Sequence, residues 1–293
     1  MGALGYYLAL PFLYGISLLP FPLLYVLSDA LRFVLFTMIG YRQEVVLTNL
    51  RNSFPDKSEA EIQKIRHDFE QWFCDLVVET LKTLTIAPDT VRKHVQMSGT
   101  EILREYAVRK QSVVIVLGHF GNWELAGARY SAEPGLPQLY VIYHPLENKK
   151  FDGLMHHMRT RHGTKLYTMR ETSKAMLRDK HLNTATAFIA DQTPSPERAY
   201  WMEFLSQDTP VFQGTEALSR KLGYPVVHIS ITRPKRGYYH MQVETLVADP
   251  SATGVGEITT IHTRRLERDV RKYPELWLWT HRRWKHKRPT TVN

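Results

Sequence analysis

Short runs of β-branched and aromatic residues recur from residue 112 onward, and they restrict the fold more than any other feature of the chain. The run Ser112–Leu117 (SVVIVL) is almost continuously β-branched, which is typical of a strand buried on both faces. Similar runs follow at 139–143, 184–190 and 225–231, and the alternating segment 238–247 predicts a hairpin partner across Arg236–Gly237. Helical patterns separate these runs, at 125–130, 148–161, 173–180, 215–222 and 256–272. The sequence therefore predicts an α/β fold with a mixed, largely parallel sheet flanked by helices.

The first part of the chain has a different character, since residues 1–28 contain no charged side chain. A helix over residues 2–19 would be about 27 Å long, which barely crosses a hydrocarbon core. A secretory signal peptide would carry basic residues before its apolar stretch and small residues at a cleavage site, and neither is visible. Residues 1–41 are accordingly predicted to be a helical segment that anchors the protein to a membrane. A pair of apolar helices in a soluble core is the alternative, and the pattern does not decide between spanning the bilayer and lying in one leaflet.

A long amphipathic helix is predicted next, over residues 58–83. Ser58 and Glu61 have the spacing of a capping box, and apolar residues then recur at helical intervals. This helix is the helical lead-in within one α/β domain, which is predicted to occupy residues 42–293.

Composition narrows the function classes. The 293 residues are 43% hydrophobic and 23% charged, with a formal charge of +9 and a pI near 9.5. Such a basic chain favours an anionic partner, which could be a nucleic acid, an acidic protein or a phospholipid surface. A nucleic-acid binder would interleave basic and aromatic residues on one element, and only the stretch 281–288 approaches this pattern, so no nucleic-acid partner is expected. Cys74 is the single cysteine and no H-E-x-x-H motif occurs, so neither a metal site nor a metal-dependent hydrolase is predicted.

The segment 118–124 (GHFGNWE) is the best candidate for catalysis. It follows the most apolar strand, at the sheet edge where open α/β folds bind their ligands. Gly121 permits a sharp turn, and Asn122 can cap the helix that begins there. Glu124 lies five residues after His119, a spacing that can bring its carboxylate to one imidazole nitrogen and leave the other free as a general base. A structural histidine that closes the loop is the alternative.

With this H-x-x-x-x-E segment the chain resembles the glycerolipid acyltransferase superfamily, whose H-x4-D/E box follows a hydrophobic strand. Further segments resemble the late acyltransferases of lipid A biosynthesis, the lauroyl and myristoyl transferase group. These segments are Tyr143–Asn148 (YHPLEN), Asp191–Pro194 (DQTP), Phe204 with Pro210 and Gly214–Thr215, and Tyr273–Lys285 (YPELWLWTHRRWK). They occur in the family's order, and with the apolar N-terminus the resemblance covers essentially the whole chain.

The resemblance implies a membrane-associated O-acyltransferase of the EC 2.3.1 type. The acyl donor would be a thioester of acyl carrier protein or coenzyme A, and no cofactor is expected. His119 would remove the proton of the attacking hydroxyl, and Glu124 would orient the ring. The implied acceptor is a lipid A precursor, and another lysolipid, aminolipid or glycolipid is the alternative. The implied location is the inner membrane, with the catalytic domain on the cytoplasmic side.

Six further residues are predicted to bind substrate. Amides around Gly121 and Asn122 are candidate donors to the oxyanion, as is Arg159, since the family has a functional arginine at this place. Arg161 is the alternative to Arg159, and either could equally be a solvated helix charge. Asp191 and Gln192, at the end of another apolar strand, converge on the same sheet edge as His119 and could bind the acceptor headgroup or cap the loop.

Overall fold

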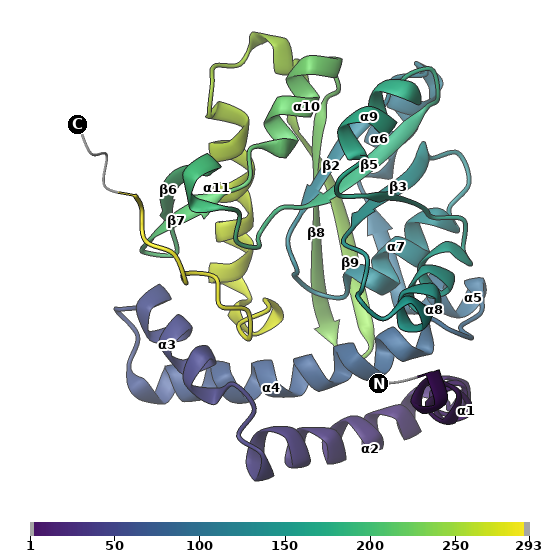
Figure 1. The fold of residues 1–293 in the computed structure, drawn as a ribbon, viewed down its shortest axis with the longest axis vertical. Helices are drawn as coiled ribbons and strands as arrows, with labels where there is room; N and C mark the ends of the chain where they lie inside the picture. The colour runs from purple at the N-terminus through teal and green to yellow at the C-terminus, as the bar shows by residue number, and fades with distance from the viewer. Residues whose placement is uncertain (1–2, 290–293) are drawn as a thin grey trace.

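The computed structural model describes residues 3–289. Its centre is a seven-stranded sheet with the strand order β1-β9-β8-β2-β5-β3-β4 (Figure 1). The strands are β1 Val95–Ser98, β2 Val113–Leu117, β3 Gln138–Tyr143, β4 Lys165–Thr168, β5 Thr184–Ile189, β8 Val226–Lys235 and β9 Tyr238–Val247. The neighbouring strands pair in parallel except β8 and β9, which form an antiparallel hairpin. The predicted α/β class with a mixed, largely parallel sheet is therefore confirmed.

Every strand predicted from sequence is present, and four others are present as well. β1 and β4 each have four residues, and a separate antiparallel hairpin joins β6 (Tyr200–Phe204) to β7 (Gln207–Val211). These strands are short and only partly apolar, so they lack the continuous β-branched pattern that marks the buried strands.

Helices cover the sheet. They are α3 Gln43–Ser53, α4 Glu59–Lys82, α5 Pro88–His94, α6 Thr100–Val108, α7 Trp123–Ser131, α8 Lys149–Thr160, α9 Thr172–Arg178, α10 Gly214–Leu222 and α11 Glu257–Lys272. The predicted capping box of α4 is confirmed, because Ser58 and Glu61 hydrogen-bond each other's backbone. α4 lies across one end of the sheet, between the sheet and the N-terminal helices (Figure 1).

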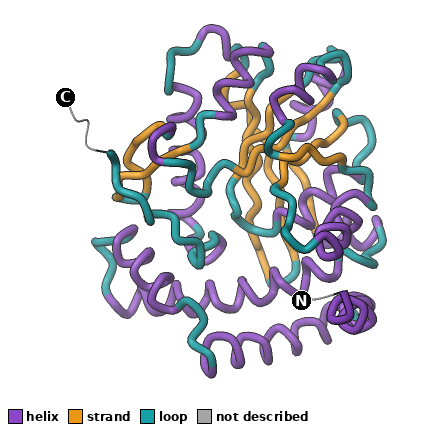
Figure 2. The backbone as a smooth tube through the Cα atoms, viewed as in Figure 1, coloured by secondary structure: helices purple, strands orange, loops and turns teal. Residues whose placement is uncertain are grey.

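The N-terminal segment forms α1 (Ala3–Leu18) and α2 (Phe21–Arg32), and a π-helical turn at Phe33–Met38 continues α2. Within the described residues, Phe21–Met38 is long and apolar enough to cross a membrane, with a mean hydropathy of 1.5. α2 runs alongside α4 rather than away from the domain (Figure 2), and Leu24 and Ser28 on its inner face are fully buried.

The parallel register explains where a site can form. β2 and β5 are neighbours, and Leu117 is aligned with Ile189. The residues two positions after each strand, His119 and Asp191, therefore emerge side by side at the carboxyl edge of the sheet.

Candidate active site

The turn of residues 118–122, here called the catalytic turn, is fixed by its backbone. Gly121 has φ +64°, and a Cβ at this position would lie 2.1 Å from the Ile231 carbonyl oxygen, so only glycine fits. The Gly121 amide donates to the Leu276 carbonyl at 2.9 Å. This amide is therefore engaged within the protein, contrary to its predicted role as an oxyanion donor.

The His119 ring is held by Asp191. Its Nδ1 lies 2.7 Å from Asp191 Oδ1, while the His119 amide donates to Asp191 Oδ2 at 2.7 Å. The sequence predicts Glu124 as the carboxylate that orients this ring and assigns Asp191 to substrate binding. In the structure the carboxylate on the ring is that of Asp191, which is buried and does not line the cavity beside His119.

A third donor completes the environment of Asp191. The indole Nε1 of Trp277 donates to Asp191 Oδ2 at 2.8 Å, and Trp277 also forms an isolated antiparallel bridge with Phe120 of the catalytic turn. Burial opposes ionisation, but the facing His119 ring and these hydrogen bonds outweigh it and lower the pKa of Asp191 to about 2. Asp191 is thus a carboxylate at neutral pH, able to keep the proton on Nδ1 and to stabilise an imidazolium.

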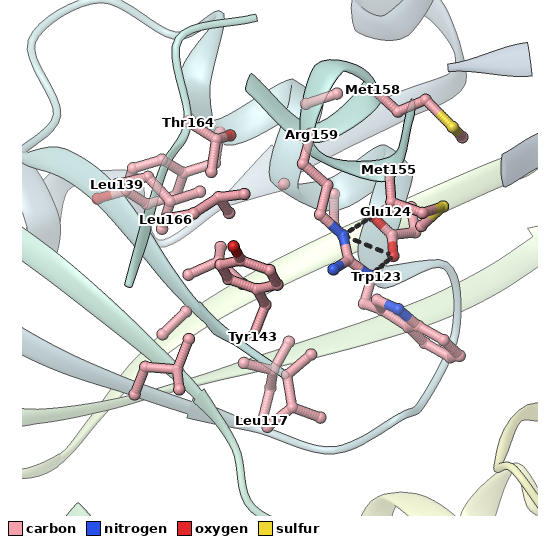
Figure 3. A pocket seen from close by; sticks show the side chains of 18 of the residues that line it. Leu117, Trp123, Glu124, Leu139, Tyr143, Met155, Met158, Arg159, Thr164 and Leu166 are labelled. Atoms are coloured by element: carbon pink, nitrogen blue, oxygen red, sulfur yellow. Dashed lines mark hydrogen bonds and ion pairs between the residues drawn. The ribbon is translucent and has the colours of Figure 1, made fainter. Parts of the chain in front are cut away.

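Glu124 faces Arg159 instead of His119 (Figure 3). Glu124 Oε1 accepts from Arg159 Nη2 at 2.6 Å, and both carboxylate oxygens accept from Nε at 3.1 to 3.2 Å. Although burial works against the charged form, the Glu124 carboxylate raises the pKa of Arg159. Since α7 presents Glu124 and α8 presents Arg159, the ion pair joins two helices at the wall of the cavity.

Arg159 and Arg161 differ in their surroundings. Arg159 uses Nε and Nη2 for Glu124, so Nη1 is the guanidinium nitrogen not committed to that pair. Arg161 donates through Nη1 to the carbonyls of Thr83 and Ile86, just beyond the C-terminus of α4. That contact is typical of a structural arginine near a helix C-terminus, and it does not support the predicted role of Arg161 in substrate binding.

The other two predicted binding residues, Asn122 and Gln192, also differ in their surroundings. Asn122 is fully buried; its Oδ1 accepts from the Leu125 amide at 2.9 Å, which confirms that it caps α7, and its Nδ2 donates to Glu79. The Asn122 side chain therefore supports the catalytic turn from the protein interior. Gln192 lines the cavity, and its side-chain amide lies 3.4 Å from His119 Nε2.

A cavity of about 510 Å³ opens beside His119. Polar side chains in its wall include His119, Glu124, Arg159 and Gln192, with His144, Asp152 and His156 also among the lining residues. The remaining lining is mainly apolar and buried; it includes Ile115, Leu117, Leu139, Val141, Ala126, Ile229, Met241 and Met158, with Met155 beside the ion pair (Figure 3). A cavity of this size with a few convergent polar groups is typical of a small-molecule site.

Fold and site together define an α/β enzyme whose binding site suits a largely apolar substrate beside a histidine. The chain belongs to the bacterial lipid A biosynthesis acyltransferase family, whose model matches residues 2–286, and it is an acyltransferase of the EC 2.3.1 type. It is 24% identical over 271 residues to the lipid A biosynthesis lauroyltransferase of Escherichia coli K12, covering 91% of this chain and 87% of the relative. It is 23% identical over 269 residues to the lipid A biosynthesis palmitoleoyltransferase of the same organism, covering 91% and 86%. The family resemblance predicted from sequence is thus confirmed.

Proposed function

We propose that this protein is a membrane-associated O-acyltransferase that moves a fatty acyl chain from a thioester to a hydroxyl group of a lipid A-type acceptor. The donor would be an acyl carrier protein or coenzyme A thioester, and the enzyme would work at the cytoplasmic face of the inner membrane. The observation that carries the proposal is the position of His119, whose Nδ1 is bonded to buried Asp191 while its ring faces a mainly apolar cavity. Family membership supports the acceptor class.

His119 would act through Nε2. This nitrogen removes the proton of the acceptor hydroxyl as the hydroxyl oxygen attacks the thioester carbonyl, and the C–O bond forms. When the tetrahedral intermediate collapses, the C–S bond breaks and the imidazolium returns the proton to the departing thiolate. Asp191 keeps the proton on Nδ1 throughout and stabilises the imidazolium, as the carboxylate does in a serine protease triad. The apolar cavity would hold the acyl chain beside this centre.

Donors to the oxyanion are fewer than the sequence alone indicates. With the Gly121 amide engaged, the amides of Asn122 and Trp123 at the N-terminus of α7 and the uncommitted Nη1 of Arg159 are the candidates. We assign Glu124 the role of orienting Arg159, which replaces its expected role beside His119.

The function is tested by supplying purified protein with a lipid A precursor and a radiolabelled acyl thioester of either carrier. We expect the label to appear in ester linkage on the precursor, and mass spectrometry of lipids from cells with and without the gene should show the same added acyl group. Parallel assays supply a lysophospholipid, an aminolipid or another glycolipid as the acceptor, and label transferred only in one of these would establish the alternative acceptor.

Replacing Arg159 should separate transition-state stabilisation from acceptor binding. Because Nη1 is placed as a donor at the cavity wall, we expect Arg159→Lys to lower kcat about tenfold or more with little change in KM for the thioester. Steady-state kinetics with labelled donor measures both constants. Arg161→Lys is the matched control, since its contacts lie at the end of α4, and it should keep both constants within about twofold. A rise confined to the KM of the acceptor would assign Arg159 to headgroup binding instead.

The N-terminal helices support the proposed membrane association. Large apolar side chains are exposed on them; they include Tyr7, Leu8, Phe12, Leu18, Leu23, Val26, Phe33, Val34, Met38 and Ile39. The inner face of α2 also makes polar contacts with the domain, because Ser28 donates to Asp75 at 2.6 Å and Asp29 pairs with Arg236 at 2.6 Å. Crossing the bilayer would break these bonds, so we propose that α1 and α2 lie in the membrane surface with their apolar face in the lipid.

Polar substitutions on that face should release the protein from membranes. We expect the combined change Leu8→Gln, Phe12→Gln, Leu23→Gln and Val26→Gln to shift it from the membrane pellet to the supernatant, because each residue loses favourable contact with lipid. High salt should not extract the unchanged protein, since salt screens charges but not apolar contacts. Val108→Gln with Val255→Gln is the control; both side chains are more than four-fifths exposed, but they lie on other surfaces. Extraction of the unchanged protein by salt alone would disprove the apolar anchor.

A further inference from the structure

Glu79 of α4 is a fully buried carboxylate surrounded by neutral donors. Tyr25 Oη donates to Oε1 at 2.8 Å, while Tyr239 Oη and Asn122 Nδ2 donate to Oε2, each at 2.6 Å. No lysine, arginine or histidine forms a salt bridge with Glu79 among the described residues. Burial raises the pKa of Glu79 to about 7 despite these donors. A buried acid without an ion pair costs folding free energy, so its presence here calls for an explanation.

The three donors come from three separate parts of the fold. Tyr25 belongs to α2, Tyr239 to β9 and Asn122 to the catalytic turn. α4, which carries Glu79, lies between α2 and the sheet (Figure 1). Glu79 is thus the group at which the N-terminal helices, the sheet and the catalytic turn meet.

Asn122 transmits this contact to the site. Its Oδ1 caps α7 through the Leu125 amide, so its Nδ2 must point toward Glu79, and the two contacts together fix the orientation of the side chain. His119 is three residues earlier in the same turn. Asp191 and Trp277 hold the turn on one side, and Glu79 holds it on the other.

A second buried acid on the same helix provides a contrast. Asp75, one turn earlier on α4, is also fully buried, but it is ion-paired with Arg233 and Arg236 and accepts from Ser28. None of these partners belongs to the catalytic turn. Asp75 therefore has the environment of a structural ion-pair residue, and Glu79 does not.

We propose that Glu79 is a positioning residue that fixes the catalytic turn through Asn122, and that Tyr25 joins the N-terminal apolar helix to the same hydrogen-bonded unit. Replacing Glu79 by methionine, which has nearly the same length, removes both acceptor oxygens, so Asn122 Nδ2 loses its partner and the turn loses this support without any change to the cavity lining. The inference rests on the proposed role of His119 in acyl transfer.

The test compares full-length variants in acyl-transfer kinetics, with kcat normalised to the folded fraction from thermal unfolding. Glu79→Met should lower kcat at least about tenfold while KM for the thioester stays within about twofold, since the cavity is untouched. Asp75→Asn should lower the unfolding temperature but leave kcat per folded molecule near that of the unchanged protein. Equal kcat values for Glu79→Met and the unchanged protein, or equal losses in both variants, would overturn the proposal.

Rescue makes the test specific. Asn122→Asp alone places a carboxylate opposite the Glu79 carboxylate, so this hydrogen bond is lost although the new side chain still caps α7. Adding Glu79→Gln supplies an amide that can donate to the new carboxylate, so the hydrogen bond is restored with reversed polarity. We expect Asn122→Asp to lower kcat and the double variant to recover most of that loss, and a double variant no more active than Asn122→Asp would contradict the proposed geometry.

Two further comparisons keep the outcome decisive. Should Glu79→Met fail to fold, Tyr239→Phe removes one donor and should lower kcat about threefold, whereas Tyr167→Phe, which removes a hydroxyl bonded to Asp179 outside the site, should not. An unchanged kcat in Tyr239→Phe would then overturn the inference. Activity retained in His119→Ala would instead remove the proposed function on which the inference rests.

Discussion

His119→Ala should reduce acyl transfer by at least about a thousandfold, to the background seen without enzyme. The imidazole is the group placed both to take the hydroxyl proton and to return it to the thiolate, so its loss affects both steps. Transfer of labelled acyl chain to the lipid acceptor measures the effect. Because the His119 side chain is at the cavity wall and its main contact is with Asp191, the variant should remain folded and membrane-bound.

The control is His157→Ala, since His157 is an exposed residue of α8 that does not line the cavity. It should retain full turnover. Turnover of His119→Ala close to that of the unchanged protein would exclude general-base catalysis by this residue and would leave the cavity as a binding site only.

Asp191→Asn should lower kcat by about 10³- to 10⁴-fold with little effect on KM, through the wrong tautomer of His119. Oδ2 of Asp191 accepts two hydrogen bonds, from the His119 amide and the Trp277 indole, so the oxygen of an asparagine must take that position. Its amide nitrogen then faces Nδ1 and forces the ring proton onto Nε2. A ring protonated on Nε2 cannot accept the proton of the acceptor hydroxyl.

A second buried His–Asp pair provides the matched control for this variant. His228 Nε2 lies 3.0 Å from Asp269 Oδ2, and neither residue lines the large cavity. Asp269→Asn should cost stability in thermal unfolding while kcat per folded molecule stays within about twofold. Comparable kcat losses in both variants would show that the Asp191 effect is structural. A large loss in Glu124→Gln with none in Asp191→Asn would restore Glu124 as the orienting carboxylate.

Much of the fold could be predicted because buried parallel strands have an unmistakable composition. β2 is a continuous apolar run, β8 begins with a buried run rich in β-branched residues, and the capping box marks the start of α4. Strands such as β4 could not be predicted, since Lys165–Thr168 has one buried side chain and no clear alternation. The apolar N-terminus could also be recognised from the sequence. The hydrogen bonds that attach α2 to the domain could not, because they depend on tertiary packing.

Sequence spacing could identify candidate site residues only where they lie close together in the chain. His119 and Glu124 share one strand–turn–helix unit, so their proximity suggested a direct contact, whereas Asp191 lies 72 residues after His119. Only the strand order, in which β5 is next to β2, brings Asp191 to the ring, and the sequence is compatible with several strand orders. The contact of Glu124 with Arg159 depends on how α8 packs against α7, which sequence periodicity does not determine.

The contact of Trp277 with Asp191 has a consequence for synthesis of the protein. Trp277 follows Asp191 by 86 residues, so at about 5–20 residues per second the ribosome adds it roughly 4 to 17 seconds later. During that interval the growing chain already contains His119, Asp191 and the apolar N-terminal helices, but Asp191 lacks its indole donor and Gly121 lacks the Leu276 carbonyl. The hydrogen bonds that hold Asp191 and the catalytic turn are therefore completed only after translation has passed residue 277.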